Sequence, residues 1–600
     1  MRLVALSLIL AAFTGLSAAD LQTDVCIYGA TPGGVAAALS AARSGSEVVL
    51  VEPTARIGGL LTSGLSHTDF HSLESLTGSF LEFSQKVKAY YVKTYGADSE
   101  QVKACFEGTF GEPKVNLLIL EQMLAGESRI QIHRGAALEK VEKEGTQIGA
   151  IHFKGLSVHA KVFVDGSYEG DLLAKAGVSY HVGREGRDDY GESLAPEKGD
   201  SQLQAYNFRF CATDDSANRV PIAAPAGYKR EDFLPVLDFL KPGEIERVFG
   251  YPSKCIVKAQ TPALPNHKYD LNDVSRGLVR LSMPGHNLGW PEGDAAARQA
   301  IFAEHLRYNV GLLYFLINDE AVPAHIQEPA RAWGWCKDEF TETDHLPPQL
   351  YVREARRMTG EHIYVQQDSE HAAGDARAKL FTDSIAMGDY GNNCHGTSHE
   401  GPQIGGKHGG ELYNPVPPYQ IPYGALVPKA AECTNLLVPV ALSSSHVGFC
   451  ALRLEPIWMS LGQATGHAAA LAAKSGQSVQ DVPVPKLQTL LWADHSATLY
   501  VADVPPGHTL FTAVQWWGTA GGLHGLNPMP AKLGQRGKNL HGQYYEANPG
   551  HAVELDKALD DATRTRWLEL AQKLGVPTST LTQTKTRGGF IEKAFTAAKP

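Results

Sequence analysis

The first residues after the N-terminal segment alternate between apolar runs and small residues in a way that predicts strand, helix and strand. Residues 23–30 form a short apolar run, residues 33–45 are small residues of helical character, and residues 46–53 form a second buried run. Two buried strands joined by a helix within about thirty residues make a βαβ unit. The pattern therefore predicts an α/β fold with a Rossmann-like start.

Further elements follow from the same periodicities. Residues 298–319 predict a long amphipathic helix, and residues 160–177 predict a strand followed by a helix that begins near Asp171. Residues 434–449 predict a buried strand that ends in three serines and His446. Residues 455–476 predict a helix with proline in its first turn and one nearly flat face at Gly462 and Gly466.

The turn between the first strand and the first helix has the chemistry of a nucleotide site. It keeps the first and last glycines of a GxGxxG motif, with threonine at the middle position. The first glycine lets the chain turn sharply, and the last lets helix and strand approach closely, so that free N–H groups at the helix start face a pyrophosphate. The predicted contacts in this turn are Gly29, Thr31, Gly33 and Gly34.

Two features after the second strand extend this prediction. Glu52 ends that strand, where a carboxylate accepts hydrogen bonds from ribose hydroxyls and repels a 2′-phosphate. An RxGG run then offers a guanidinium and two unhindered backbone positions to a phosphate. The alternative is a βαβ unit with incidental glycines. The predicted contacts in this run are Arg56, Gly58, Gly59 and Thr62.

At the RxGG run the sequence resembles the flavin-binding half of the glutathione-reductase-like FAD oxidoreductases. Later segments resemble a family of often exported FAD-dependent oxidoreductases that is distantly related to the flavoprotein subunit of heterodisulfide reductase. The resemblance extends from Asp24 to about Gly522 and is carried by residues 58–70, 162–178, 351–361, 417–429, 435–472 and 511–522. One departure is Gly424, where the family typically has arginine, so the pocket is wider or the substrate less anionic.

The resemblance implies FAD as cofactor and redox chemistry, without naming a substrate. It implies a discontinuous FAD-binding domain over residues 22–180 and 425–480, an inserted α+β substrate domain over 181–424, and a mostly helical C-terminal appendage over 486–600. It also implies that the returning strand brings Asp165 and Gly166 beside the nucleotide, and that the helix containing Gly462 points its N-terminus at the flavin pyrimidine. The alternatives are a helix cap or turn for Asp165 and Asp171, and plain packing for the helix.

The catalytic candidates follow from the ends of predicted strands and from one polar loop. His446 is the first choice for moving a proton, since imidazole titrates near neutral pH, and His395 is the candidate from the glycine-rich loop. Arg453 suits a substrate carboxylate or hydroxyl, or reduced flavin; pairing with Glu455 is the alternative. A structural histidine is the alternative for His446. His67 and Asp69 lie close enough to the RxGG run to line the ring.

Two further clusters have competing interpretations. Three histidines and an acid of one loop, His395, His399, His408 and Glu400, could hold zinc or iron, but no metal is predicted because they lack a helical ligand spacing. The arginines Arg353, Arg356 and Arg357 suit an acidic substrate group, or else form a solvated basic helix face.

Composition and the N-terminus limit the location and the partners. The 600-residue chain has a net charge of −11, which argues against nucleic acid or an anionic membrane as main partner. Residues 1–19 predict a signal peptide cleaved near Ala19, hence export to the periplasm or outside without stable membrane insertion; a membrane anchor is the alternative.

The eight cysteines are widely scattered, which argues against iron–sulfur clusters and structural zinc. Their spacing leaves disulfide pairing open. Cys26 lies inside a predicted strand.

Together these observations predict an exported FAD-dependent oxidoreductase. It transfers hydride from a small polar organic substrate, a carbohydrate or hydroxy acid, to flavin N5, with an unknown electron acceptor. One alternative is a lyase or isomerase that oxidises a sugar transiently, and another is a non-redox binding protein. The appendage either packs against the enzyme or, through Trp516 and Trp517, binds sugar.

Overall fold

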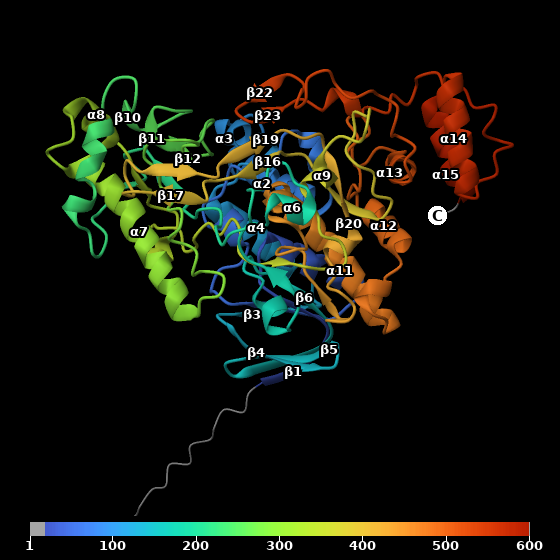
Figure 1. Ribbon diagram of the computed structural model, residues 1–600, viewed down its shortest axis with the longest axis horizontal. Coiled ribbons are helices and arrows are strands. Elements are labelled where there is room, and N and C mark those ends of the chain that lie inside the picture. Colours follow the sequence, from blue (N-terminus) through green and yellow to red (C-terminus); the bar gives the residue numbers. More distant parts are fainter. Residues whose placement is uncertain (1–18, 599–600) are drawn as a thin grey trace, which may run out of the picture.

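A computed structural model describes residues 19–598 of the protein (Figure 1). The predicted signal peptide falls mostly on residues 1–18, outside the described part of the chain. The first sheet has seven strands in the order β3-β2-β1-β6-β5-β4, with β21 also beside β6. These strands are β1 (Ala19–Tyr28), β2 (Val48–Glu52), β3 (Ile130–Arg134), β4 (Leu138–Glu144), β5 (Gln147–Phe153), β6 (Leu156–Asp165) and β21 (Leu436–Leu437).

This sheet is parallel where the nucleotide motif lies and antiparallel elsewhere. β3, β2, β1, β6 and β21 run parallel, whereas β4, β5 and the first half of β6 form an antiparallel meander. Alternate residues of β2 enter different hydrophobic cores, Leu50 on one face and Val49 and Val51 on the other. A strand buried on both faces is typical of parallel sheets covered by helices. The predicted Rossmann-like α/β fold is confirmed, and Cys26 is buried in β1 as expected.

Two glycine-rich helices pack on each other beside this sheet. They are α1 (Pro32–Arg43) and α11 (Glu455–Ser475). A Cβ atom added at Gly462 would lie 2.0 Å from the backbone oxygen of Gly33, and one added at Gly466 would lie 2.3 Å from that of Ala37. The predicted flat face of α11 therefore allows its backbone to touch that of α1.

A second sheet of six strands lies away from the first and is flanked by the longest helix (Figure 1). Its order is β10-β11-β12-β8-β13-β9, and the predicted helix over 298–319 is found as α7 (Ala295–Asn318). The other elements here are β8 (Phe210–Thr213), β9 (Arg219–Val220), β10 (Arg247–Gly250), β11 (Cys255–Ala259), β12 (Lys268–Asp273), β13 (Gly334–Cys336) and α8 (Ala324–Ala330).

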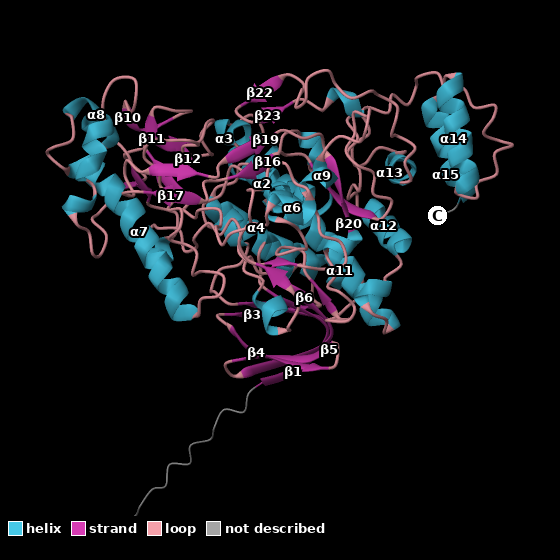
Figure 2. Cartoon of the chain, viewed as in Figure 1, coloured by secondary structure: helices cyan, strands magenta, loops and turns pink. Residues whose placement is uncertain are grey.

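Short elements and long loops fill the space between the two sheets (Figure 2). The strand predicted over residues 434–449 is only two residues long, as β21, and His446 instead begins a helix. The glycine-rich loop contains two small hairpin pairings. Elements of this region are α2 (Gly78–Tyr95), α3 (Glu100–Ala104), α4 (Pro113–Ala125), α5 (Asp171–Lys175), α6 (Arg187–Tyr190), α9 (Gln366–Ser369), α10 (His446–Leu452), β7 (Tyr180–His181), β14 (Arg357–Met358), β15 (Ser384–Gly388), β16 (Asn392–Cys394), β17 (Ser398–Glu400), β18 (Lys407–Gly409), β19 (Leu412–Asn414) and β20 (Tyr419–Pro422).

The C-terminal region has its own hydrophobic core. Trp517 is fully buried there against Trp567 and Phe590, so the two adjacent tryptophans do not form an exposed platform for sugar. No helix among residues 19–598 is both long and apolar enough to cross a bilayer. The predicted domain boundaries stay predictions. Elements of this region are α12 (Val484–Ala493), α13 (Phe511–Thr519), α14 (Asp561–Lys573), α15 (Arg587–Ala598), β22 (Asn539–His541) and β23 (Tyr544–Tyr545).

Candidate active site

The end of β1, the start of α1 and the end of β6 meet at backbone contact distance. Gly29 has φ +92°, and a Cβ atom added to it would lie 2.6 Å from the backbone nitrogen of Ser167. A Cβ at Gly34 would lie 1.9 Å from the oxygen of Gly29, and one at Gly166 would lie 2.7 Å from the same oxygen. Side chains are therefore excluded from this junction, which is the arrangement that the glycine motif predicts.

Thr31 has a definite role at the position where the motif usually has glycine. It is the N-cap of α1, and its hydroxyl accepts a hydrogen bond from the backbone N–H of Gly34 at 3.2 Å. The same hydroxyl donates to the backbone oxygen of Gly166 at 2.6 Å. Thr31 therefore both caps the helix and joins it to β6, which explains the departure from the motif.

Glu52 lies beside the glycine turn, as the prediction requires. The backbone N–H of Ala30 donates to Oε2 of Glu52 at 2.8 Å, and the backbone N–H of Thr54 donates to Oε1 at 2.9 Å. Burial raises the pKa of the Glu52 carboxyl, although these hydrogen bonds favour its ionised form. A carboxylate has acceptor sites beyond these bonds, so Glu52 can still receive ribose hydroxyls.

A groove of about 740 Å³ is lined by residues of this turn and by residues far along the chain, among them Trp290 and Arg356. This volume is sufficient for a cofactor-sized ligand. Its lining includes five of the predicted cofactor residues. The lining includes Gly29, Thr31, Glu52, Arg56, Gly59, Ala137, Leu138, Tyr168, Asp171, Trp290, Arg298, Leu350, Val352 and Arg356.

Side chains of the RxGG run form hydrogen bonds within the same segment and a salt bridge to a neighbouring loop. The guanidinium of Arg56 lines the groove, donates to the backbone oxygen of Thr62 at 2.9 Å and pairs with Glu342. The Thr62 hydroxyl donates to the backbone oxygens of Ile57 and Gly59, and its side chain is fully buried. Gly58 adopts a positive φ behind the groove lining. Contacts of Arg56 and Thr62 with a cofactor stay predictions.

The Asp165 side chain forms hydrogen bonds within the segment that directly follows β6. Its carboxylate accepts hydrogen bonds from the backbone of Ser167 and from that of Leu173 in α5, and it does not line the groove. Burial raises the pKa of Asp165 to about 6. These contacts are those of the alternative prediction, in which Asp165 stabilises a turn or caps a helix. Asp171 instead lines the groove, where Arg298 and Arg356 pair with it.

The N-terminus of α11 reaches the groove through Tyr168. The Tyr168 hydroxyl, which lines the groove, donates to Oε1 of Glu455 at 2.7 Å, and its ring packs against Trp458. Oε2 of Glu455 and Nε1 of Trp458 are buried and have no hydrogen-bond partner among the described residues. Burial raises the pKa of Glu455 to about 8. Unpartnered polar atoms at the end of a glycine-lined groove fit a dinucleotide with a polar ring system.

Beyond the end of the groove lies a set of basic side chains, here called the cationic cluster: Lys258, Arg353, His395 and Arg453. Arg353 donates to Asn207 and Ala205, and Arg453 donates to the backbone oxygen of Asn393 at 2.6 Å. Within residues 19–598, Nε of Arg353 and both Nε and Nη1 of Arg453 are buried without a hydrogen-bond partner. The cluster can therefore bind an anion, because buried guanidinium groups with free donors favour a carboxylate.

The predicted alternative for Arg453 is not formed. Glu455 directs its carboxyl to Tyr168 rather than to Arg453, and no salt bridge of Arg453 is found in the described chain. Burial lowers the pKa of His395 well below its usual value, and the charges of Arg353 and Arg453 lower it further. His395 is therefore a neutral imidazole at neutral pH, able to accept a proton.

The three neighbouring arginines do not form a solvated helix face. They lie in an extended segment, and all three are buried, which overturns that alternative. Arg356 pairs with Asp171 and Glu292, and Arg357 pairs with Glu185 and Glu354. Carboxylates neutralise these two, so only Arg353 has donors left for a substrate.

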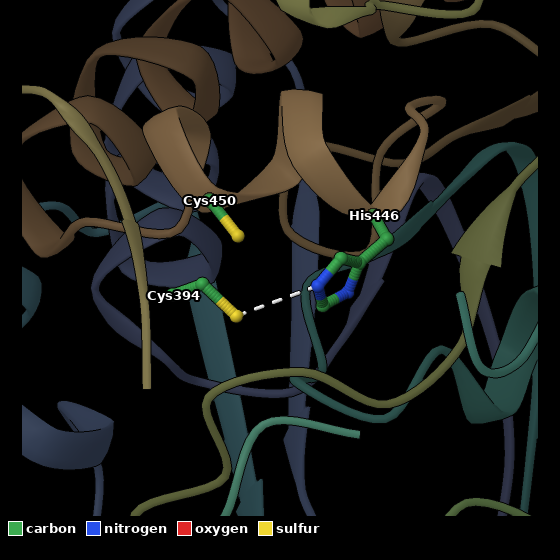
Figure 3. Close-up of side chains that lie close together, drawn as sticks. All are labelled: Cys394, His446 and Cys450. Atoms are coloured by element: carbon green, nitrogen blue, oxygen red, sulfur yellow. Dashed lines mark hydrogen bonds between the residues drawn. The ribbon is translucent and has the colours of Figure 1, made fainter. Parts of the chain in front are cut away.

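His446 lies between a carboxylate and a thiol, and Figure 3 shows the side that faces the thiol of Cys394. Its Nδ1 is 2.9 Å from both carboxylate oxygens of Glu354, and its Nε2 is 3.4 Å from Sγ of Cys394. Burial opposes its charge, but Glu354 and Cys394 outweigh burial and raise the pKa of His446 to about 10. Both ring nitrogens are thus occupied, and proton transfer by His446 stays a prediction.

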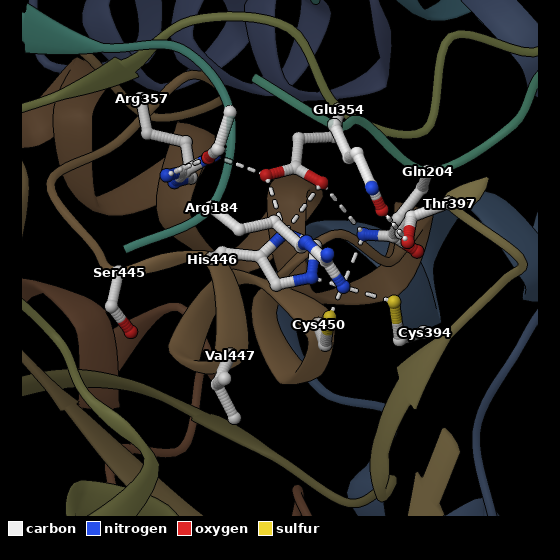
Figure 4. Close-up of polar contacts among 12 residues, drawn as sticks. Arg184, Gln204, Glu354, Arg357, Cys394, Thr397, Ser445, His446, Val447 and Cys450 are labelled. Atoms are coloured by element: carbon white, nitrogen blue, oxygen red, sulfur yellow. Dashed lines mark hydrogen bonds and ion pairs between the residues drawn. The ribbon is translucent and has the colours of Figure 1, made fainter. Parts of the chain in front are cut away.

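Cys394 and Cys450 lie next to His446 and Glu354 (Figure 4). The sequence patterns did not identify either cysteine as part of this site. The neighbouring Cys450 thiol is the main cause that lowers the pKa of Cys394 to about 6; burial opposes it and His446 adds to it. Glu354 is held by Arg357, and the pKa of its carboxyl falls to about 2 because the charges of His446 and Arg357 outweigh burial. The two cysteines are 56 residues apart with no shared motif, so no sequence signal reveals them.

The predicted alternative of a histidine-rich metal site is not supported. His399 and His408 face each other across the β17–β18 hairpin, with Nδ1 atoms 3.3 Å apart. In the described chain, neither His395 nor Glu400 joins them in a group of ligand distance.

The C-terminal region also contributes to this site. The Tyr544 hydroxyl donates to the backbone oxygen of Thr68 at 2.8 Å, and the Gln543 amide donates to Asp69 at 2.9 Å. His67 stacks on Phe110, and burial followed by the charge of Arg209 lowers the pKa of His67 to about 3. The predicted lining role for His67 and Asp69 stays a prediction, with the appendage packed over both.

Comparison with known proteins gives one family and several distant structures. The family described as FAD dependent oxidoreductase matches residues 24–491. No curated protein matches the chain. OxyS anhydrotetracycline hydroxylase from Streptomyces rimosus is 14% identical, with 28% of this chain and 36% of that chain covered at a TM-score of 0.19. Thioredoxin reductase of T. acidophilum is 20% identical, with 28% and 40% covered at a TM-score of 0.14. The chain thus spans less than half the length of either structure.

Proposed function

Since the chain belongs to the family of FAD-dependent oxidoreductases, we propose that it is an exported enzyme that oxidises a small hydroxy acid to the keto acid. FAD is its cofactor, and the bound flavin supplies the two-electron acceptor. The observation that supports the substrate class is the pair of buried arginines with unused donors, Arg353 and Arg453, beside the neutral imidazole of His395.

The glycine-lined groove is the part that would hold FAD. Glu52 would receive the ribose hydroxyls, and the backbone N–H groups at the start of α1 would receive the diphosphate. Tyr168 and Glu455 lie where the groove approaches α11, so their polar groups would contact the flavin end. Burial keeps Glu455 protonated at neutral pH, which makes it a hydrogen-bond donor there.

The cationic cluster favours an acid over a neutral sugar. A carboxylate can accept hydrogen bonds from the free donors of Arg353 and Arg453 at once, whereas hydroxyl groups would leave part of the buried charge uncompensated. Lys258 is half-buried, and no salt bridge of it occurs in the described chain, so it adds positive charge to the same region.

His395 is the group we assign to the proton. The substrate hydroxyl loses its proton to the imidazole while the C–H hydrogen leaves with the electron pair, so that one hydroxyl becomes one carbonyl. Burial and, after it, the surrounding cations keep His395 unprotonated, and the cations would also stabilise a developing alkoxide. His446 is less suited, because Glu354 and Cys394 already occupy its ring nitrogens.

Export is proposed from the apolar N-terminal residues and the small residues that precede Asp20. Mass spectrometry of protein secreted by an expressing cell would find a mature N-terminus near Asp20. An N-terminus at Met1 on purified, cell-associated protein would contradict export.

The function is tested by anaerobic bleaching of the flavin absorbance with hydroxy acids and with polyols of matching size that lack the carboxylate. We expect hydroxy acids alone to bleach the flavin rapidly. His395→Asn should slow bleaching by roughly 100- to 10,000-fold without loss of flavin, while His399→Asn, in the nearby hairpin, leaves the rate unchanged. Equal bleaching by neutral sugars, or product formed without any electron acceptor, would contradict the proposal.

A further inference from the structure

We propose that Cys394, His446 and Cys450 form a binding site for a thiophilic metal ion, zinc(II) in the first place. The three candidate ligand atoms, Sγ, Nε2 and Sγ, all lie within 4.8 Å of one another (Figure 3). All three side chains are at least 97% buried. Cys394 comes from β16, and His446 and Cys450 lie four residues apart in α10, so the tertiary fold brings Cys394 to the other two.

The observed spacing matches the spacing of ligands around zinc. Zinc binds thiolate sulfur at about 2.3 Å and imidazole nitrogen at about 2.0 to 2.1 Å in tetrahedral geometry, which separates sulfur from nitrogen by about 3.6 Å. The distance from Sγ of Cys394 to Nε2 of His446 is 3.4 Å. This pair therefore needs to move by only a few tenths of an ångström to bind the ion, and the other two pairs, which lie within 4.8 Å, need to close by about 1.2 Å at most.

The surrounding side chains already orient the ligands. Glu354 accepts from Nδ1 of His446 at 2.9 Å, which directs Nε2 at the two cysteines. The Gln204 amide donates to Sγ of Cys450 at 3.5 Å and to Glu354 at 3.2 Å. A carboxylate behind a ligating histidine is the usual support of a zinc site, because it selects the tautomer and raises the basicity of the ligand.

A second group of side chains at metal-ligand distance in the described residues is already occupied by a cation of the protein. Glu112, Asp338 and Glu339 also lie within ligand distance of one another. Their centre is taken by the ammonium of Lys268, whose Nζ is 2.6 Å from Glu112, 2.6 Å from Glu339 and 2.9 Å from Asp338. Around Cys394, His446 and Cys450, no lysine or arginine of the described chain forms a hydrogen bond to either sulfur; the side chains that do are His446 and Gln204.

Ligand chemistry selects the ion. Two thiolates and one imidazole favour zinc(II) or copper(I) over the hard cations magnesium and calcium. Binding requires both cysteines as thiolates and Nε2 of His446 without a proton, so protons are released as the ion binds, and the two thiolate charges neutralise a divalent ion. Three protein ligands leave a fourth position open, as in zinc sites that bind water or a small ligand.

The test uses the full-length, FAD-loaded protein with metal content measured by elemental analysis after dialysis against zinc and then against metal-free buffer. We expect about one zinc per chain in the natural protein and a loss of at least tenfold in affinity in both Cys394→Ser and Cys450→Ser. Cys211→Ser is the matched control, because Cys211 lies 3.6 Å from the thiol of Cys336, is equally buried and has no histidine in reach. It should retain the metal.

A second measurement needs no variant. Cobalt(II) loaded into the natural protein should give the thiolate-to-metal charge-transfer absorbance of cysteine ligation, and zinc should protect Cys394 and Cys450 from alkylation until a chelator is added. The proposal is overturned if zinc and cobalt fail to bind the folded holoenzyme. It is equally overturned if peptide mapping under non-reducing conditions finds Cys394 and Cys450 joined in a disulfide, or if Cys211→Ser loses as much metal as the two ligand variants.

Discussion

The nucleotide groove and the cationic cluster are neighbours built by opposite means. The groove is made of backbone: Gly29, Gly34 and Gly166 meet where a single Cβ atom would overlap main-chain atoms. The cationic cluster is made of long side chains, Arg353 and Arg453, held by carbonyl and amide oxygens of distant segments. In the proposed function, the groove would bind the diphosphate of FAD through main-chain N–H groups, and the cationic cluster would select an anionic substrate through charge.

The difference predicts how each region responds to change. A backbone junction has no flexible side chain that can move aside, so a small addition there disrupts both the fold and the cofactor site. A cluster of buried cations can lose one member and keep its fold, but it then loses recognition of an anion. Effects on flavin binding and effects on substrate should therefore separate between the two regions.

The largest effect is expected from Gly34→Ala. The added Cβ would lie 1.9 Å from the backbone oxygen of Gly29, so β1 and α1 must separate and the N–H groups of the turn lose their position. We expect no retained FAD and little folded protein by flavin absorbance and circular dichroism. Gly149→Ala is the control, because its Cβ finds only one atom, at 3.9 Å. If the Gly34→Ala protein is stable and yellow with bound FAD, the groove does not depend on close backbone contact at Gly34.

The next largest effect is expected from Glu455, on the pH dependence of stability. Its folded-state pKa of about 8 lies above the ordinary value of 4.5, so its contribution to stability is complete below about pH 4.5 and is lost as the pH rises through 8. Glu455→Gln mimics the neutral acid and should abolish this decline, which amounts to roughly 4 kcal/mol. Urea unfolding of flavin-free protein between pH 5 and 8.5 measures it.

The exposed Glu139 provides the control for that experiment. Glu139→Gln should leave the pH dependence of the natural protein unchanged, because Glu139 lies on the surface of β4. Parallel stability curves for Glu455→Gln and the natural protein would mean that Glu455 is ionised in the folded state.

The smallest effect is expected from Arg453→Lys. The positive charge remains, but the planar fork that can bind a carboxylate at two points is lost. The KM for the hydroxy acid should rise roughly 10- to 150-fold, as expected for the loss of one hydrogen bond to a charged group. Retained FAD and an unchanged melting temperature would show that the groove is intact.

Arg377→Lys is the matched variant for this comparison, because Arg377 is also buried and donates to backbone oxygens, but those of the C-terminal region. It should lower stability and leave KM unchanged. If both variants changed KM equally, the cationic cluster would have no special role in substrate binding.

Predictions from sequence succeeded where structure depends on neighbours in the chain. The βαβ unit, the glycine turn and Glu52 lie within the 34 residues from Ala19 to Glu52, and the backbone N–H of Ala30 in the turn donates to Glu52. They could not decide which of two alternatives a side chain adopts. The structure gives Asp165 the turn contacts that were its alternative, to Ser167 and Leu173, while contact with a cofactor stays a prediction; it also pairs Glu455, the alternative partner of Arg453, with Tyr168.

The sequence by itself determined the class of fold and the cofactor, because turn geometry and helix N-termini act within a few residues. Only the tertiary structure decided which charges are neutralised and which are free. Arg357 and Arg353 are four residues apart, yet Arg357 pairs with Glu185 and Glu354, whereas Arg353 has no salt bridge to a carboxylate within residues 19–598. It also brought Cys394 to Cys450 and His446. Such pairings depend on long-range packing, which residue spacing does not encode.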